Sequence, residues 1–223
     1  MAKEAPELFA HKEWLGQIQQ VGLVVSPFVL VRRGVGINKQ RGLEVQTRIN
    51  AISVEEESGD RLISDFATFA HEILEWPSEL LAEPSATVCV SLPEHEDVLT
   101  PTLTVVGPGF SPAEEGGPGL QSRPLVLISV VSGGFDSLPD HHAGWRATPH
   151  ARLERLLREI EVPIGLLYNG RALRLVYAPR GESSGHLTFK LKDLLHTQGR
   201  PMSTNPRACF TPGRWFCRTP SLR

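Results

Sequence analysis

The feature of this sequence that most constrains its fold is the apolar run from Leu125 to Val131, which only Ser129 interrupts. Successive side chains of a strand point to opposite faces of a sheet. A strand that is apolar at nearly every position is therefore covered on both faces, as in the centre of a sheet. The run predicts an interior strand, and hence a layered fold with a sheet at its middle.

The residues that follow predict a helix and a hairpin. Thr148-Pro149 is typical of a helix start, and the leucines after it predict a helix that ends near Ile160. Strands are predicted over 162–168 and 173–177. Asn169-Gly170 lies between them, and this pair favours a two-residue type I′ turn because both of its residues tolerate positive φ.

The remaining elements complete an α+β chain whose mixed central sheet is flanked by helices. Helices are predicted over 27–33, 42–54 and from Ser64 or Asp65 to Leu74, with a short one over 191–195. Strands are predicted over 87–90, 103–106 and 186–190, a polar turn over 93–97, and loops over 107–119 and 133–149. We expect three parts: a helical part over 1–84, the sheet core over 85–200 and a basic tail over 201–223.

Composition limits the function classes. With 40% hydrophobic and 22% charged residues the chain should fold, whereas 18 prolines and 20 glycines disfavour a helical bundle. A net charge of -2 provides no general attraction for nucleic acid, so DNA contact would need a local basic patch. Met1 to Pro6 lacks a secretory signal, and no apolar run approaches the roughly 18 residues of a membrane span. We therefore expect a cytoplasmic protein with no membrane partner.

Cysteines and histidines do not form a recognisable metal or catalytic motif. Cys89, Cys209 and Cys217 are irregularly spaced and are predicted to be free thiols. His141-His142, with Asp136 and Asp140, superficially resembles a metal cluster, but adjacent histidines in a loop point apart, so we expect no metal. The other histidines are scattered along the chain, and no pair of nucleophile and base is predicted.

The order of elements resembles the PD-(D/E)xK nuclease core. The segments from Trp145 to Gly170 and from Tyr177 to Gly185 further resemble the amino-terminal region of large adenine-specific DNA methyltransferases. These belong to type IIG-like restriction-modification systems and to DISARM-like phage-defence systems, and the resemblance extends over roughly 10–201. It implies a chain cut off before its methyltransferase part, with DNA and other defence subunits as partners.

Two departures from these families imply that the chain performs no chemistry. A PD-(D/E)xK site holds magnesium with carboxylates on two strands, whereas the corresponding positions here are Thr102, Ile128 and Val130. The tail from Ser203 replaces the family's apolar helices, and Asn205-Pro206-Arg207 stops short of an Asn-Pro-Pro-Tyr motif. S-adenosylmethionine is therefore implied only for the missing methyltransferase domain, and no cofactor is expected in this chain.

Several basic and polar residues are candidates for DNA contact. Arg152, Arg155 and Arg158 recur at helical spacing, but acids lie between them, and a mixed exposed surface is the favoured interpretation. Arg146 precedes this helix. The loop over 178–185 carries Arg180 and Ser183 and could hold a phosphate, dock a neighbouring domain or simply join two strands.

Three functions therefore remain open from the sequence. The first is a non-catalytic module that assists DNA binding or assembly of the methyltransferase. The second is an active magnesium-dependent endonuclease that uses displaced acids such as Asp97 or Glu94, although acids in such a turn are usually just solvated. The third is an interaction scaffold of a defence complex that ignores DNA.

Overall fold

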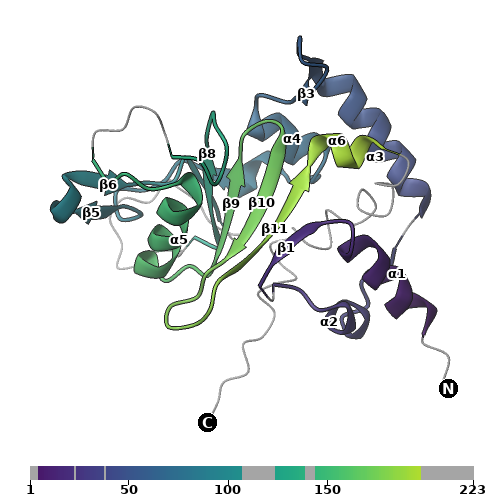
Figure 1. Cartoon of the computed structure of the whole chain (residues 1–223), viewed down its shortest axis with the longest axis horizontal. Helices are drawn as coiled ribbons and strands as arrows, with labels where there is room; N and C mark the ends of the chain where they lie inside the picture. Colours follow the sequence, from purple (N-terminus) through teal and green to yellow (C-terminus); the bar gives the residue numbers. More distant parts are fainter. Residues whose placement is uncertain (1–4, 23, 38, 107–123, 139–143, 197–223) are drawn as a thin grey trace.

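A computed structural model describes residues 5–22, 24–37, 39–106, 124–138 and 144–196. The elements are, in chain order, α1 (Pro6–Leu15), β1 (Gln19–Val21), α2 (Pro27–Arg32), α3 (Lys39–Ile52), β2 (Val54–Glu55), β3 (Arg61–Leu62), α4 (Phe66–Glu72), η1 (Ser78–Leu80), β4 (Leu81–Ala82), β5 (Val90–Leu92), η2 (Pro93–His95), β6 (Asp97–Leu99), β7 (Leu103–Val105), β8 (Val126–Val130), α5 (Pro149–Ile160), β9 (Ile164–Tyr168), β10 (Ala172–Tyr177), β11 (Gly185–Lys190) and α6 (Leu191–Leu195). Figure 1 shows them around a central sheet.

The sheet has seven strands in the order β1-β11-β10-β9-β8-β7-β4. Strands β8 and β9 are parallel, and every other neighbouring pair is antiparallel. Helix α5 joins the parallel pair, as such a pair requires a crossover connection. The predicted mixed sheet flanked by helices is confirmed, and β8 lies inside it, between β7 and β9, as its apolar pattern predicted.

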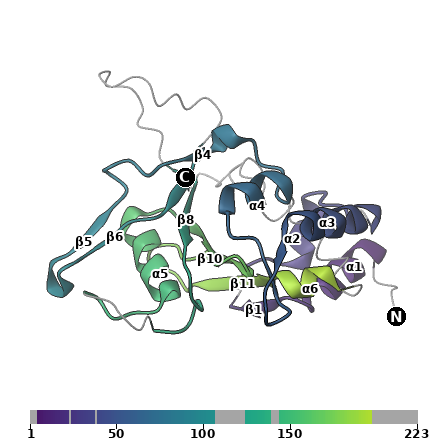
Figure 2. The same ribbon diagram turned by 90° about the horizontal axis from the view of Figure 1, so that it is seen from above.

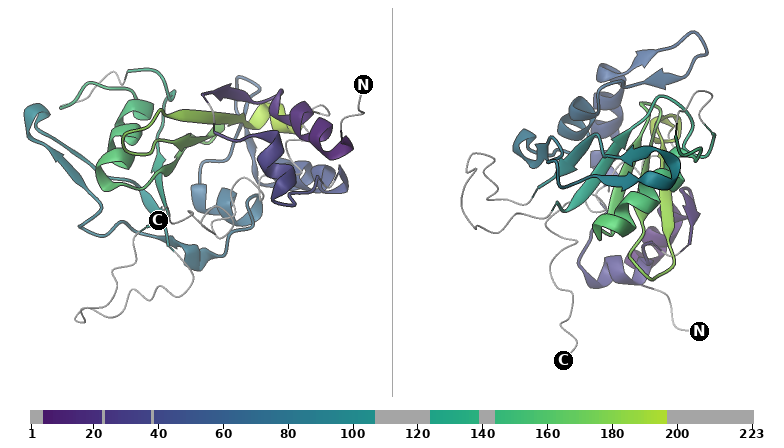
Figure 3. Two further views of the ribbon diagram at one scale, coloured as in Figure 1. Left: turned by 90° about the horizontal axis from the view of Figure 1, so that it is seen from below. Right: turned by 90° about the vertical axis from the view of Figure 1, so that its left-hand side faces the viewer.

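The two faces of the sheet bury separate apolar cores. Alternating residues of β8 illustrate this, because Ile128 belongs to one core and Leu127 to the other, and both are fully buried. The first core lies under α1 to α4 and α6, and the second lies under α5 and the β5–β6 hairpin. In Figures 2 and 3, α5 and α4 accordingly lie on opposite faces of the sheet.

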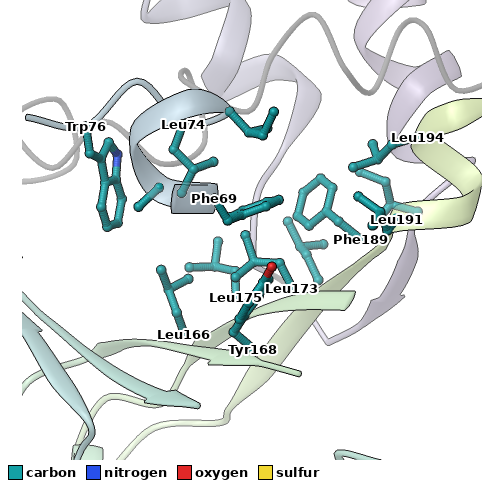
Figure 4. Close-up of a cluster of buried hydrophobic side chains, with 14 of the residues drawn as sticks. Phe69, Leu74, Trp76, Leu166, Tyr168, Leu173, Leu175, Phe189, Leu191 and Leu194 are labelled. Atoms are coloured by element: carbon teal, nitrogen blue, oxygen red, sulfur yellow. The ribbon is translucent and has the colours of Figure 1, made fainter. Parts of the chain in front are cut away.

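Aromatic side chains join α4 to the sheet in the first core (Figure 4). The Tyr168 ring of β9 packs against Phe66 and Phe69 of α4, with ring centroids 5.2 and 5.1 Å apart. Its hydroxyl donates a hydrogen bond to the backbone oxygen of Ile63 at 2.5 Å. The Asp65 carboxylate caps α4 by accepting from the Thr68 amide at 2.7 Å, which agrees with the predicted helix start.

The turn between β9 and β10 is not the predicted type I′ turn. That turn needs positive φ at both central residues, whereas only Gly170 has one, at 80°, and Tyr168 pairs with Leu173. The Asn169 side chain instead accepts hydrogen bonds from the amides of Arg171 and Ala172, at 3.1 and 2.8 Å. Asparagine therefore serves as a side-chain cap rather than as a left-handed residue.

The predicted strand over 87–90 is wrong for all but its last residue. A turn precedes Val90, and β5 then pairs with β6 as a separate two-stranded hairpin outside the main sheet. The main sheet instead has β4 at one edge and β1 at the opposite edge. The sheet therefore extends across the boundary expected at residue 84.

Some sequence predictions lie outside the described residues. These are the loop over 107–119, the tail over 201–223, Asp140, His141, His142, Cys209 and Cys217. Cys89 is exposed and free, as predicted. None of the helices in the described ranges combines the length and apolar character that crossing a membrane requires.

Candidate functional site

A cavity of about 730 Å³ opens where β8 ends. It is bounded by α5, by the strand β6 and by the segment over 131–138 that leaves β8. Its lining residues are Val98, Leu99, Thr100, Thr102, Ser129, Val130, Val131, Ser132, Gly133, Gly134, Ser137, Leu138, Ala147, Pro149, Arg152, Leu153 and Leu156. Ligands of α/β sheets commonly bind beyond the carboxyl ends of parallel strands, which is where this cavity lies.

Two of the three residues at the expected nuclease positions meet in this cavity. Thr102 and Val130 both line it, and the Thr102 hydroxyl accepts a hydrogen bond from the Val130 amide at 3.0 Å. The side chains of Ile128 and Val130, two residues apart on β8, both pack into the core on the other face. Within the described ranges, no group of three or more histidine, cysteine, aspartate or glutamate side chains could hold a metal ion.

Asp97 lies next to the cavity-lining residues Val98 and Arg152 and is not a solvated acid, contrary to the expectation for a polar turn. Its side chain is only 11% exposed and accepts a hydrogen bond from Arg152 at 2.6 Å. It also accepts from the backbone amides of Trp145 and Val98, at 3.1 and 2.8 Å. These bonds, Arg152 first, lower the pKa of Asp97 to about 2.

A second set of contacts ties the hairpin tip to α5. Arg155 pairs with Glu94 at 2.6 Å and lies over the Trp145 ring, 5.2 Å from its centroid. The His95 ring stacks on Trp145 at 5.6 Å. The pKa of Glu94 is lowered, first by its own backbone amide and then by Arg155. The hairpin is therefore attached to α5 by two ion pairs and a stack of side chains.

Each of the three arginines that recur along α5 is thus paired with a carboxylate. Arg158 pairs with Glu154 of the same helix at 2.7 Å, whereas the acids facing Arg152 and Arg155 come from the hairpin. This arrangement favours the interpretation of α5 as a surface helix of mixed charge. The acids that pair with Arg152 and Arg155 lie 55 and 61 residues away from them in sequence.

The other DNA-contact candidates are exposed but separated. Arg146 precedes α5, and Arg180 pairs with Glu161 just beyond the end of that helix, at 3.0 Å. Ser183 is exposed in the same loop as Arg180. The candidates therefore lie toward opposite ends of a helix of 12 residues.

A buried polar cluster, which the sequence did not predict, adjoins the cavity. Arg174 of β10 is 2% exposed, and its guanidinium donates to both Asp136 oxygens at 2.6 and 2.7 Å. It also donates to the Thr188 hydroxyl at 2.9 Å and lies 5.0 Å from the centre of the Phe135 ring. Arg174 lowers the pKa of Asp136. Phe135 and Asp136 belong to the segment that bounds the cavity, so this cluster positions it.

Two histidines that looked scattered in the sequence meet in this cluster. The rings of His150 and His186 are 4.8 Å apart, edge to face. Burial and then Arg174 lower the pKa of both, that of His186 to about 4, so both are neutral at pH 7. Nδ1 of His150 is buried and has no hydrogen-bond partner among the described residues. We call Asp136, His150, Arg174, His186 and Thr188 the arginine-histidine cluster.

Replacing Asp97 with asparagine is expected to loosen the hairpin. The variant keeps the shape but loses the charge that pairs with Arg152, and partly buried charged hydrogen bonds contribute about 1.5–3 kcal/mol. We expect about 1.5 kcal/mol lower stability of the hairpin, and faster amide hydrogen exchange over 90–99. Glu79→Gln, outside the hairpin, is the matched control. Unchanged exchange in the Asp97→Asn variant would show that Arg152 does not hold the hairpin.

No protein-family model, curated protein or solved structure matches the chain.

Proposed function

We propose that this chain is a non-catalytic module of a restriction-modification or phage-defence adenine-specific DNA methyltransferase, and that it assists DNA binding by the larger protein. One observation carries the proposal: where a PD-(D/E)xK nuclease would hold magnesium, the cavity presents the Thr102 hydroxyl and the Val130 backbone amide that donates to it, and no carboxylate is among its described lining residues. The order of β4, β7, β8, α5 and β9 along the chain and across the sheet also supports a nuclease-like ancestry. S-adenosylmethionine would bind elsewhere, in a methyltransferase domain.

The endonuclease alternative is disfavoured by the state of the nearest acids. A magnesium site needs carboxylate oxygens that are free to bind the ion. Asp97 is held by Arg152 and two backbone amides, and Glu94 is held by Arg155. Plasmid DNA incubated with the protein and magnesium or manganese is expected to stay intact. Cleavage that Asp97→Asn abolishes would establish the endonuclease instead.

DNA binding is expected to depend on the exposed arginines at the two ends of α5. In mobility-shift assays at low salt, the chain should bind duplex DNA at micromolar concentration. The double variant Arg146→Ala/Arg180→Ala should bind more weakly, and the slope of log affinity against log salt should fall by about 2 because each phosphate contact contributes about 0.9. The charge-matched control Arg33→Ala/Arg61→Ala should bind like the parent. No shift at micromolar protein would contradict the proposal.

An interaction scaffold is a second candidate, favoured by exposed apolar side chains near one sheet edge. Phe9 of α1, Val21 of β1 and Phe28 of α2 are 60%, 50% and 64% exposed, and these three elements lie together in Figure 1. Exposed apolar groups gathered in one region commonly mark a protein interface. If the chain is a scaffold, Phe9→Ser/Phe28→Ser should abolish co-purification of a defence-complex subunit, and the parent should not shift DNA.

A further inference from the structure

The cavity at the end of β8 has two kinds of wall. Apolar side chains of β6 and α5, including Leu99, Leu153 and Leu156, form one part. Residues that carry hydroxyl groups line another part, namely Thr100, Thr102, Ser129, Ser132 and Ser137. Small-molecule sites typically combine apolar walls with a few polar groups that orient the ligand. The volume of about 730 Å³ lies within the range of roughly 300–1,000 Å³ usual for such sites.

Two of the large apolar side chains left exposed by the fold also line this cavity. Val98 is 52% exposed and Leu138 is 51% exposed. Val98 comes from the hairpin and Leu138 from the end of the segment that leaves β8, so the two belong to different walls. Apolar surface that remains open beside a concave site favours the entry of a partly apolar ligand.

The charge of the lining favours a ligand without net charge. Arg152 is the one ionisable side chain among the lining residues that the structure describes, and Asp97 balances its charge at 2.6 Å. The hydroxyls can each donate or accept a hydrogen bond. A flat ring with apolar faces and hydrogen-bonding edges matches walls of this chemistry better than an ion does.

The segment over 131–138 brings two adjacent glycines, Gly133 and Gly134, to the cavity. A Cβ added at Gly133 would meet no atom within 4 Å, so this glycine faces open space. Hydrogen bonds fix the segment in place: Asn169 donates to the Gly133 oxygen at 3.0 Å, and the Ser137 hydroxyl donates to the Gly134 oxygen at 3.1 Å. The cavity is therefore held open by the fold.

From these features we infer that the cavity binds a nucleobase, an uncharged planar nitrogen heterocycle of the purine or pyrimidine type. The base can come from a free nucleoside or from a nucleotide that has left its pair in DNA. The DNA source rests on the proposed function, whereas the free nucleoside does not.

Titration of the full chain with adenosine, guanosine, cytidine and thymidine, followed by nuclear magnetic resonance, tests the inference. Saturable shifts of the amides over 129–138 are expected with at least one nucleoside. Gly133→Leu should weaken binding at least tenfold by occupying the open space, whereas Gly36→Leu, at an exposed glycine with equally open surroundings, should bind like the parent. Ser129→Val, which keeps the shape but removes a hydroxyl, should weaken binding about threefold to tenfold.

A duplex with a fluorescent purine analogue opposite an abasic position tests the DNA source. If the base enters the cavity, its fluorescence should change with the parent and with Gly36→Leu but not with Gly133→Leu. Nucleoside binding without any DNA binding would support the cavity as a free-nucleoside site and contradict the proposed function. No nucleoside binding at millimolar concentration, with duplex binding equal in parent and Gly133→Leu, would overturn the inference and leave the proposed function standing.

Discussion

Replacing Asp136 with alanine is expected to lower the free energy of unfolding by about 2 kcal/mol, because it leaves the buried guanidinium of Arg174 without its counter-ion. Removing one partner of a wholly buried pair typically costs about 3–5 kcal/mol. The smaller figure applies here because the Asp136 side chain is 65% exposed, although that of Arg174 is only 3% exposed. Urea denaturation of parent and variant measures the difference.

A second replacement separates charge from packing. In Asp136→Ala/Arg174→Met the unpaired cation is gone and methionine fills much of its volume, so most of the lost stability should return. Arg180→Ala, which breaks an exposed pair with Glu161, should change stability by less than about 0.5 kcal/mol. If Asp136→Ala proves as stable as the parent, Arg174 does not depend on this carboxylate.

The protein is expected to lose up to about 3 kcal/mol of stability as pH falls from 6.5 to 4. His186 has a pKa of about 4 in the folded chain and an ordinary value of 6.5. Between these values the unfolded chain binds a proton that the folded chain does not, so each drop in pH favours unfolding. His150, whose pKa is also lowered, adds to the loss in the same direction.

The groups around the two rings explain the direction of this effect. Burial and the cation of Arg174 on β10 disfavour a second positive charge, and they outweigh the carboxylates of Asp136 and Glu154. Chemical denaturation at several pH values should show that His186→Gln removes most of the slope between pH 6.5 and 4. The matched control His71→Gln, on α4, should keep the same slope of stability against pH as the parent. A flat stability profile in the parent would show that His186 takes up protons freely in the folded chain.

The contact between Asp97 and Arg152 loses its stabilising effect at lower pH than the histidines do. The pKa of Asp97 is lowered from 3.8 to about 2, so its stabilisation is complete above pH 3.8 and is lost as pH falls toward 2. Losses above about pH 5 therefore report on the histidines, and losses at lower pH report increasingly on carboxylates such as Asp97.

The elements that the sequence predicted correctly are those whose signals are local. The run from Leu125 to Val131 shows burial on both faces, and Thr148 caps α5 by accepting from the Ala151 amide at 3.2 Å. Strand β4 has only two residues and β1 only three, too few for a period to emerge. Val88 follows a turn and is buried in the same core as the α5 leucines, so an apolar residue at this position does not indicate a strand.

The arginine-histidine cluster could not be predicted because it depends on strand register. Arg174 pairs with Thr188 and Val176 pairs with His186, which places all three polar side chains on the face that α5 covers. A one-residue shift would have sent them to the other face. One signal was present: Arg174 is the charged residue between Leu173 and Leu175, and a charge inside an apolar strand needs a partner of opposite charge.

The pairing of β1 with β11 has a consequence for how the chain acquires its shape. Gln19 lies opposite Thr188, so a contact between neighbouring strands spans most of the polypeptide. Closing so long a loop is entropically costly and slow, whereas the β9–β10–β11 meander involves only short separations. During synthesis, β1 therefore cannot pair until β11, the last strand of the described sheet along the chain, has been made.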